Sequence, residues 1–405
     1  MSSALWSCIS CGRFFLDKVD KVCVREVFFG HNCRMIGTGS YWRARTHRRS
    51  RWSQQDSCCV GLLVLRVTST CVYVAVVGFL LFLGFYLLDS PDPDPPPADS
   101  DSVVTLLVWT HPFGQYRKLP DCLKLYHIDG CALTDDERSY PRADAVLIHH
   151  RDLVTGAADL PPEPRPNAQK WIWMNYESPA HTTEMWRFED VFNLTMTYRT
   201  DSDVFLPYGY LVPRGGLSRT QQNPRRPHLL AWVVSNWSES HTRVVFYHEL
   251  RRYIPVDVFG RAGQPIPEDS GTGVQVRKLL HRYQFYLSLE NSQHTDYITE
   301  KLWNALQAGS VPVVLGPSRQ NYERFLPPEA FIHVDDFSTV RGLARYLLML
   351  RRNPVRFRRH LDWKRRYRVH QTSFWTEHYC TACRAVRRTR GRTDVVQDLT
   401  RWFRS

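Results

Sequence analysis

The sequence has no internal repeat and no recognisable nucleic-acid-binding motif, and it has fewer acidic than basic residues. Its 405 residues include 40 Asp and Glu against 53 Lys and Arg, which gives a net charge of +13. The last 65 residues, with 18 Lys and Arg against 4 Asp and Glu, account for all of this excess. Without a binding motif, this segment is better interpreted as a solvated basic face than as an RNA site. We therefore expect no nucleic-acid partner, although this charge would attract acidic glycans or a membrane surface.

Charge is absent from residues 71–88, an apolar run of 18 positions, close to the ~20 residues that cross a bilayer. Arginines precede the run and five aspartates follow it between residues 89 and 101, so the positive-inside rule places the N-terminus in the cytoplasm. We predict a cytoplasmic tail over 1–66, a transmembrane signal anchor over 67–88 and a Pro/Asp-rich stem over 89–102. A cleaved signal peptide is the weaker alternative, because such peptides begin near the N-terminus.

Cysteine is scarce after the apolar run. Of 11 cysteines, only Cys122, Cys131, Cys380 and Cys383 follow residue 71. Four cysteines on the oxidising side of a membrane usually form disulfides, whereas a Cys-x-x-Cys with two distant partners is also compatible with a zinc cluster. The spacing alone leaves three disulfide pairings open.

The apolar content excludes a disordered chain, since 43% of the residues are hydrophobic and 13% are aromatic. Short apolar runs alternate with helical stretches, which predicts two successive α/β domains with a ligand cleft between them. We place these domains at 103–227 and 228–370, followed by a tail at 371–405. The predicted strands are 103–109, 145–149, 170–174, 194–198, 229–235, 256–260, 285–289, 311–315 and 331–334, and the predicted helices are 239–253, 297–308 and 339–351.

Residues 296–316 combine a charged, aromatic helix start with a buried strand. Asp296 or Thr295 is expected to cap the helix, and Ala308-Gly309 to end it. Tyr297, Glu300 and Lys301 then share one face of the first turns. A helix N-terminus at the carboxyl edge of a parallel sheet favours a nucleotide diphosphate. The alternative is a surface helix with an ordinary Glu-Lys pair.

Glu177 comes three positions after Met174, where the apolar run ends, and Pro179 then turns the chain. A carboxylate at a strand end, flanked by aromatic residues, is a candidate general base, and partial desolvation would raise its pKa. The alternative is an ordinary loop carboxylate.

Two further groups are candidates for diphosphate binding. Asp201-Ser-Asp203 resembles a metal-binding Asp-x-Asp, but its position in the first domain favours a turn with cap-like hydrogen bonds. Arg243 and Lys301 are two cations that would neutralise a diphosphate without a metal. Tyr286, Glu290 and Asn291 end a neighbouring strand and are available to ribose, base or sugar.

Two glycosylation acceptors occur after the apolar run, at Asn193-Leu-Thr195 and Asn236-Trp-Ser238. We favour Asn193, because Asn236 is expected to lie in the cleft.

Several segments together resemble the animal α1,3/4-fucosyltransferases. The likeness runs from about residue 103 to the end, and within the family residues 256–267 and 321–327 look most like the myeloid type. The segments that carry it are 109–115, 149–152, 173–181, 198–209, 232–236, 256–261 and 286–301, the last being highly specific.

The resemblance implies a GT-B fold and a type II Golgi membrane protein with a luminal catalytic domain. It implies inverting transfer of L-fucose from GDP-fucose to the 3-hydroxyl of GlcNAc, with no essential metal. The acceptors would be neutral or sialylated type 2 N-acetyllactosamine glycans on glycoproteins and glycolipids, giving Lewis x or sialyl Lewis x.

Site roles follow from the same motifs. Glu177 would be the base and, with Gln115, would contact the acceptor, while Arg243 and Lys301 would bind the diphosphate. The family's disulfides correspond to Cys122 with Cys380 and Cys131 with Cys383. The other residues that the resemblance places in the donor cleft are Tyr208, Ser235, Asn236, Tyr286, Asn291, Tyr297 and Glu300.

The sequence departs from the family at two points. Several relatives carry a further disulfide where this chain has Ala231 and Tyr283, so the donor domain must be held by packing alone. The predicted cytoplasmic part is also unusually long. Two other functions stay open, namely a protein-directed O-fucosyltransferase of the endoplasmic reticulum and a non-catalytic glycan-binding relative. The sequence also leaves open whether the protein is a monomer or a homodimer.

Overall fold

The computed structural model describes residue 77 and residues 103–216, 226–266 and 273–405. The chain divides into two compact units, Met1–Pro93 and Asp94–Ser405, and the second contains every described residue except residue 77. The predicted tail and stem, and all of the predicted anchor except residue 77, lie outside the described residues. Among the residues that are described, no helix has the length and apolar character needed to cross a membrane.

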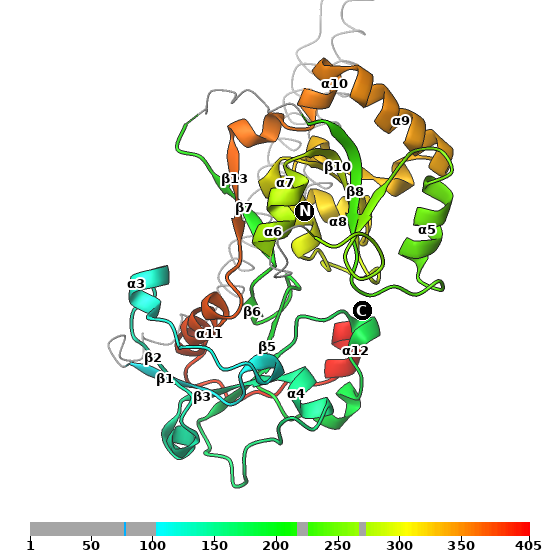
Figure 1. The fold of residues 1–405 in the computed structure, drawn as a ribbon. Helices are drawn as coiled ribbons and strands as arrows, with labels where there is room; N and C mark the ends of the chain where they lie inside the picture. Colours follow the sequence, from blue (N-terminus) through cyan, green and yellow to red (C-terminus); the bar gives the residue numbers. More distant parts are fainter. Residues whose placement is uncertain (1–76, 78–102, 217–225, 267–272) are drawn as a thin grey trace, which may run out of the picture. The chain divides into compact units, whose positions relative to one another are not determined.

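The first part of the second unit is built on a six-stranded parallel sheet (Figure 1). The strand order is β2-β1-β3-β4-β5-β6. Both β3 and β4 are buried at every position, as is typical of a parallel sheet covered on both faces. His149 lies opposite Met174 at the carboxyl ends of these two strands. The strands are β1 (Val104–Val108), β2 (Cys131–Thr134), β3 (Ala145–His149), β4 (Lys170–Met174), β5 (Leu194–Thr197) and β6 (Val204–Phe205).

The second part contains a five-stranded parallel sheet in the order β12-β11-β10-β8-β9. Its strands are β8 (His228–Val233), β9 (Asp257–Phe259), β10 (Tyr283–Leu289), β11 (Val311–Leu315) and β12 (Ile332–His333). A separate antiparallel pair is formed by β7 (Gly209–Pro213) and β13 (Tyr367–Gln371). The expected α/β class, with two parallel sheets, is therefore confirmed.

Helices cover both faces of the second sheet. Successive residues of a strand point to opposite faces, so neighbouring residues of β10 pack against different helices. Phe285 and Leu287 of β10 pack in one apolar cluster with residues of α5 (Thr242–Leu250) and α9 (Val340–Arg352). Tyr286, between them in sequence, packs in another cluster with residues of α6 (Gly273–Leu280) and α7 (Glu300–Ala308). Ala231 and Tyr283 belong to this second cluster, and the Tyr283 hydroxyl donates to Asp257 at 2.8 Å. Packing and this hydrogen bond hold these two positions, at which the family resemblance had pointed to a missing disulfide.

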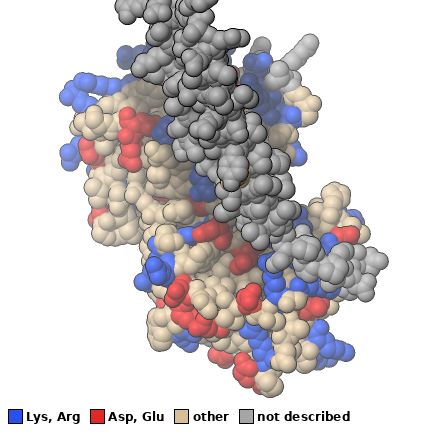
Figure 2. Space-filling model, turned by 180° about the vertical axis from the view of Figure 1, so that it is seen from behind, with Lys and Arg blue, Asp and Glu red and all other residues tan. Residues whose placement is uncertain are grey.

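Most of the remaining helices are short. They are α3 (Cys122–Tyr126), α4 (His150–Val154), α8 (Arg319–Glu323), α10 (Pro354–Arg359), α11 (Thr376–Arg388) and α12 (Leu399–Arg404). Segments of 3₁₀ helix span Pro112–Gly114, Glu137–Arg142, Pro179–His181, Met185–Phe188, Pro328–Ala330, Val334–Asp336 and Asp362–Arg365. Arginines on α9 and α10 are exposed, and Figure 2 shows Lys and Arg side chains with Asp and Glu among them on the described surface.

Helix α7 begins later than the sequence predicted. Its N-cap is Thr299, and Tyr297 lies before the helix, so Tyr297 does not share a helical face with Glu300 and Lys301. Asp296 has a left-handed backbone (φ 61°) and is not a cap. The predicted end is right, since Gly309 adopts the left-handed C-cap conformation (φ 75°) for which glycine is suited.

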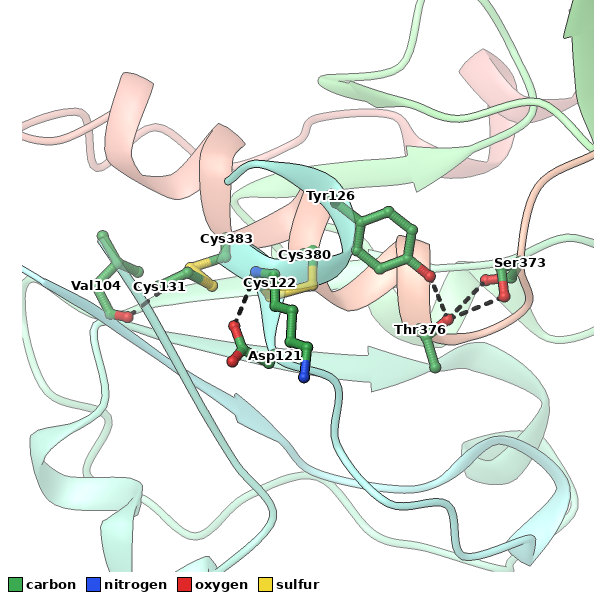
Figure 3. Close-up of a disulfide and its surroundings, with 10 residues drawn as sticks. Val104, Asp121, Cys122, Tyr126, Cys131, Ser373, Thr376, Cys380 and Cys383 are labelled. Atoms are coloured by element: carbon green, nitrogen blue, oxygen red, sulfur yellow. Dashed lines mark hydrogen bonds between the residues drawn. A yellow bond between two sulfur atoms is a disulfide. The ribbon is translucent and has the colours of Figure 1, made fainter. Parts of the chain in front are cut away.

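The C-terminal segment returns to the first sheet through α11, which contacts α3, β1, β2 and β3. Two disulfides fix it there, joining Cys122 to Cys380 and Cys131 to Cys383, with Cα–Cα distances of 5.4 and 5.9 Å (Figure 3). This pairing is the one that the family resemblance implied. The Tyr126 hydroxyl also lies 2.6 Å from that of Thr376.

Candidate active site

A cavity of about 270 Å³ lies beside the carboxyl ends of β3 and β4. Its wall is mainly aromatic and carries two carboxylates, one imidazole and one amide. The lining residues are Phe113, His149, Tyr176, Glu177, Tyr208, Glu300, Gln371, Phe374 and Trp375. Aromatic faces with a few polar groups are a typical surface for a sugar ring, whose C–H groups pack on the rings while its hydroxyls form hydrogen bonds.

Glu177 is held at the cavity by the turn that follows β4. Its backbone N–H donates to Asn175 Oδ1 at 3.2 Å, and Asn175 Nδ2 donates to Thr182 Oγ1 at 2.9 Å. The side chain is partly exposed, and its carboxylate accepts no hydrogen bond from any described residue. A rigid backbone with a carboxylate that has no protein partner suits a group that must take a proton from a ligand.

Tyr176 and Tyr208 form the wall beside Glu177. The Tyr208 hydroxyl donates to the Tyr176 carbonyl, and the two ring centroids are 5.9 Å apart. Behind Tyr176 lies His378, with ring centroids 4.5 Å apart. Burial raises the pKa of both tyrosines well above the ordinary value. These hydroxyls are therefore neutral hydrogen-bonding groups at any physiological pH.

Lys301 lies between two carboxylates at the start of α7. Its Nζ is 3.2 Å from Glu290 Oε2 and 3.2 Å from Glu300 Oε1, and it donates to Thr299 Oγ1 at 2.9 Å. Burial lowers the pKa of Lys301, but Glu290 and Glu300 outweigh burial and hold that pKa above its ordinary value. Glu290 is itself buried, and burial raises its pKa despite Lys301. Lys301 is thus a permanently charged cation at a helix N-terminus.

Arg243 on α5 joins two strand ends of the second sheet. Its Nη2 donates to the Asn236 carbonyl at 2.6 Å, and its Nη1 lies 3.5 Å from the Leu289 carbonyl. Its Nε is buried and has no partner in the part of the chain that is described. Burial lowers the pKa of Arg243, while Glu290 opposes this change. An arginine pKa starts so high that the side chain stays charged.

The comparisons with known proteins agree on one family. Residues 101–209 match the model described as Fucosyltransferase, N-terminal, and residues 223–402 match Glycosyltransferase family 10 (fucosyltransferase) C-term. Alpha-(1,3)-fucosyltransferase 4 of Mus musculus is 41% identical over 431 aligned positions, covering 94% of this chain and 98% of the relative. The chain belongs to glycosyltransferase family 10.

Other family 10 members are similarly close. Alpha-(1,3)-fucosyltransferase 4 of Homo sapiens is 47% identical over 347 residues, and the match covers 74% of this chain and 64% of the relative. The 4-galactosyl-N-acetylglucosaminide 3-alpha-L-fucosyltransferase 9 of Mus musculus is 44% identical over 299 residues, covering 74% of this chain and 82% of the relative. A crystal structure of an alpha1,3-fucosyltransferase with GDP-fucose aligns with a TM-score of 0.46 at 16% identity, over 76% of this chain and 95% of that one.

The structure brings only some of the predicted site residues to the cavity. Glu177, Tyr208 and Glu300 line it, whereas the other predicted residues do not. Gln115 is exposed, and its Oε1 accepts from Arg117 at 2.9 Å. Tyr286 and Tyr297 are buried in the protein, the latter with its ring 5.1 Å from that of Tyr198. Ser235 and Asn236 are exposed, and Asn291 is partly exposed. All three follow strands of the second sheet, and Lys301 and Arg243 lie near the ends of these strands.

The cavity is also lined by residues that the sequence analysis gave no role. Phe113, His149 and Tyr176 lie in segments that carry the family resemblance, so these motifs could have identified them as candidate site residues. Gln371, Phe374 and Trp375 reach the cavity only through the fold of the C-terminal segment. No local pattern in their sequence distinguishes them from buried structural residues.

The side chain of the favoured glycosylation acceptor, Asn193, forms four hydrogen bonds within the chain. It is buried, and its Nδ2 donates to the carbonyls of Thr393 and Asp394 at 3.3 and 3.0 Å. Its Oδ1 accepts from Arg165 and from the Trp171 N–H. The nitrogen that would carry a glycan is therefore enclosed in the folded chain. Asn236, in contrast, is exposed.

Asp201 and Asp203 form the predicted turn. Asp201 binds Arg199 through both oxygens, at 2.9 and 2.7 Å. Asp203 Oδ2 accepts from the N–H and the hydroxyl of Thr195, each at 2.8 Å. Both carboxylates already have protein partners. Within the described ranges, no group of three or more His, Cys, Asp or Glu side chains is placed to hold a metal ion.

Proposed function

We propose that this protein is an inverting α1,3-fucosyltransferase with a GT-B arrangement of its two α/β domains. It transfers L-fucose from GDP-fucose to the 3-hydroxyl of GlcNAc in type 2 N-acetyllactosamine chains of glycoproteins and glycolipids, making Lewis x or sialyl Lewis x. The observation that carries the proposal is Glu177, whose carboxylate has no partner among described residues and lines an aromatic cavity. The names of the family 10 relatives support the same reaction.

The reaction is a single displacement at the anomeric carbon of fucose. Glu177 takes the proton of the acceptor hydroxyl as its oxygen forms a bond to that carbon. The bond between the carbon and the phosphate oxygen breaks at the same time, and GDP leaves with the electron pair. Attack opposite the leaving group inverts the configuration. Negative charge on the leaving diphosphate develops in the transition state, so groups placed to bind that charge accelerate the step.

Lys301 and Arg243 supply the positive charge for the departing diphosphate. Glu290 fixes Lys301 at the N-terminus of α7, where unpaired backbone N–H groups also favour phosphate. Two protein cations can stabilise this charge, so we propose that a divalent metal is not required. The exposed Ser235 and Asn236, together with Tyr208, Asn291 and Glu300, are assigned to the remainder of the donor cleft, and Gln115 to the acceptor. Tyr286 and Tyr297 are buried, so we assign them no contact with the donor.

We place the protein in the Golgi membrane as a single-pass type II protein with residues 103–405 in the lumen. The charge-free run at 71–88 and the acidic segment after it support this location. The disulfides of the described part agree with an oxidising compartment.

The test is transfer from GDP-fucose by the purified full chain, with EDTA present, to N-acetyllactosamine and to its α2,3-sialylated form. NMR of the product gives the linkage. We expect an α1,3 product, and the ratio of the two rates identifies the Lewis antigen. GDP binding without transfer to either acceptor would contradict the proposal and favour a protein acceptor. Transfer that EDTA abolishes would contradict the metal-free part alone.

A further inference from the structure

His149 and Asp152 form a buried pair at the edge of the cavity. His149 Nδ1 lies 3.0 Å from Asp152 Oδ2, and both side chains are almost fully buried. Asp152 Oδ2 also accepts from the Thr110 hydroxyl at 3.2 Å, and Asp152 Oδ1 accepts from the Phe113 N–H at 3.1 Å. Burial raises the pKa of Asp152, but His149 and the other donors outweigh burial and hold the pKa below its ordinary value. Asp152 is therefore an ionised acceptor.

An ionised carboxylate has no hydrogen to donate, so the shared hydrogen must be on His149 Nδ1. In the neutral ring, Nε2 then carries a lone pair. No described residue donates to or accepts from Nε2. Because His149 lines the cavity, Nε2 is the ring nitrogen left for a ligand.

The imidazole is fixed between aromatic rings. Its centroid is 5.0 Å from that of Phe113 and 5.6 Å from that of Trp375. Since β3 and β4 are parallel neighbours, His149 and the turn carrying Glu177 lie at the same edge of the sheet. A ligand whose hydroxyl is next to Glu177 therefore places other groups near His149.

The chemistry of the lining selects the class of ligand. The described residues that line the cavity include the carboxylates of Glu177 and Glu300 but no Lys or Arg. Such a lining disfavours phosphate or carboxylate and favours neutral hydroxyl groups that donate hydrogen bonds. The diphosphate belongs instead near Lys301 and Arg243, outside this lining.

We propose that His149 accepts, through Nε2, a hydrogen bond from a second hydroxyl of the acceptor sugar, one that does not react. His149 thereby selects the acceptor and orients it against Glu177. Asp152 is a positioning residue, because it fixes the tautomer and the ring. This inference rests on the proposed function and adds to it a residue that recognises the acceptor.

The test uses N-acetyllactosamine and a set of monodeoxy analogues, each lacking one hydroxyl other than the reacting 3-hydroxyl. With the full-length wild type, we expect one analogue to lose about 5- to 10-fold in kcat/KM, the size of one neutral hydrogen bond. With His149→Phe, that analogue and the parent acceptor should react equally well, while the other analogues keep their wild-type ratios. The KM for GDP-fucose should not change.

Two further variants separate recognition from folding. His149→Gln keeps an acceptor oxygen and should retain part of the discrimination, whereas Asp152→Asn keeps the histidine but loses the ionised partner and should reduce it. His127→Asn is the matched control, because His127 is exposed and its left-handed backbone (φ 55°) tolerates asparagine.

The outcomes are distinguishable. A wild type that transfers to no acceptor would overturn the proposed function and this inference with it. A wild type that transfers, combined with unchanged discrimination in both His149→Phe and Asp152→Asn, would overturn this inference alone. A uniform loss on every analogue in His149→Phe, with unchanged analogue ratios, would also overturn it, since that result indicates a structural role.

Discussion

Asp296 binds Thr200 across the two α/β domains. Its Oδ2 accepts from the Thr200 backbone N–H at 3.0 Å and from the Thr200 hydroxyl at 2.8 Å. Its Oδ1 accepts from Asn321 Nδ2 at 2.6 Å and from Arg324 at 3.0 Å. Asp296, which lies in the family motif at residues 286–301, therefore links the second domain to the domain of the first sheet.

We predict that Asp296→Asn lowers the free energy of unfolding by about 2 kcal/mol, because it removes a charged acceptor from a buried network. Asparagine tolerates the left-handed backbone, so backbone strain does not contribute. Urea unfolding measures the change. Asp190→Asn is the control, since Asp190 has a similar φ of 59° but is exposed. Equal stability of the two variants would contradict the network's role.

Glu177→Gln should retain GDP binding and lose about 100-fold or more in kcat, the size expected of a general base. Glutamine has nearly the same shape, so the turn after β4 should persist. Steady-state kinetics and GDP titration measure the two quantities. Glu184→Gln is the matched control, because Glu184 is exposed and its carboxylate binds Arg187 on the surface. A kcat equal to that of wild type would remove Glu177 from this role.

Lys301→Met should weaken GDP binding about 10- to 100-fold through loss of a charged hydrogen bond. It should also destabilise the fold by about 3 kcal/mol, because buried Glu290 loses its cation. Adding Glu290→Gln should restore most of the stability, since the Gln oxygen can still accept from Thr299. It should not restore GDP binding. If the double variant binds GDP like wild type, Lys301 contributes to structure only.

Stability should fall as pH decreases from about 6.5, because two histidines are buried without charge. Burial lowers the pKa of His150 to about 4 and that of His378 to about 3. Between these values and the unfolded pKa of about 6.5, the unfolded chain binds more protons than the folded one, so this contribution is complete above 6.5 and is lost on acidification. Each histidine should account for about 2 kcal/mol between pH 6.5 and 4.5.

His378→Leu isolates one of these contributions. Unfolding measured from pH 7 to 4.5 should show a shallower decline in the variant than in wild type. A His127→Asn chain should follow the wild-type curve, because its histidine is exposed. Parallel curves for His378→Leu and wild type would show that His378 does not carry the effect.

Asn236→Gln should remove an N-glycan from the full chain, whereas Asn193→Gln should leave the glycan mass unchanged. Mass spectrometry before and after enzymatic deglycosylation measures both. Asn193→Gln should instead destabilise the fold by about 2 kcal/mol, since its amide satisfies backbone groups of two distant segments. A glycan on Asn193 in the folded protein would contradict the buried arrangement.

The sequence predicted the strands best where short apolar runs have clear polar boundaries. Residues 145–149, 170–174 and 311–315 are strands with the predicted limits. The start of α7 was predicted wrongly because the left-handed Asp296 is held by contacts with Thr200 and Arg324, which no local pattern contains.

The site was only partly predictable for a related reason. Glu177 comes shortly after a predicted strand, so strand position indicated it, whereas Tyr208 was identified only through the family resemblance. Trp375 and Gln371 come from a segment that reaches the cavity only after it folds onto the first domain. The burial of Asn193 was not predictable, because its partners, Thr393 and Asp394, are about 200 positions away in the sequence.

The crossed disulfides also set an order for synthesis. Cys122 and Cys380 are separated by 258 positions, and Cys131 and Cys383 by 252. At usual elongation speeds, roughly 10 to 50 s pass between translation of the first and last of these cysteines. During this interval Cys122 and Cys131 lack their partners, and the helix α11 that packs on β1 has not yet been made. The cavity wall supplied by Phe374 and Trp375 is thus completed only after the ribosome has reached the last residues.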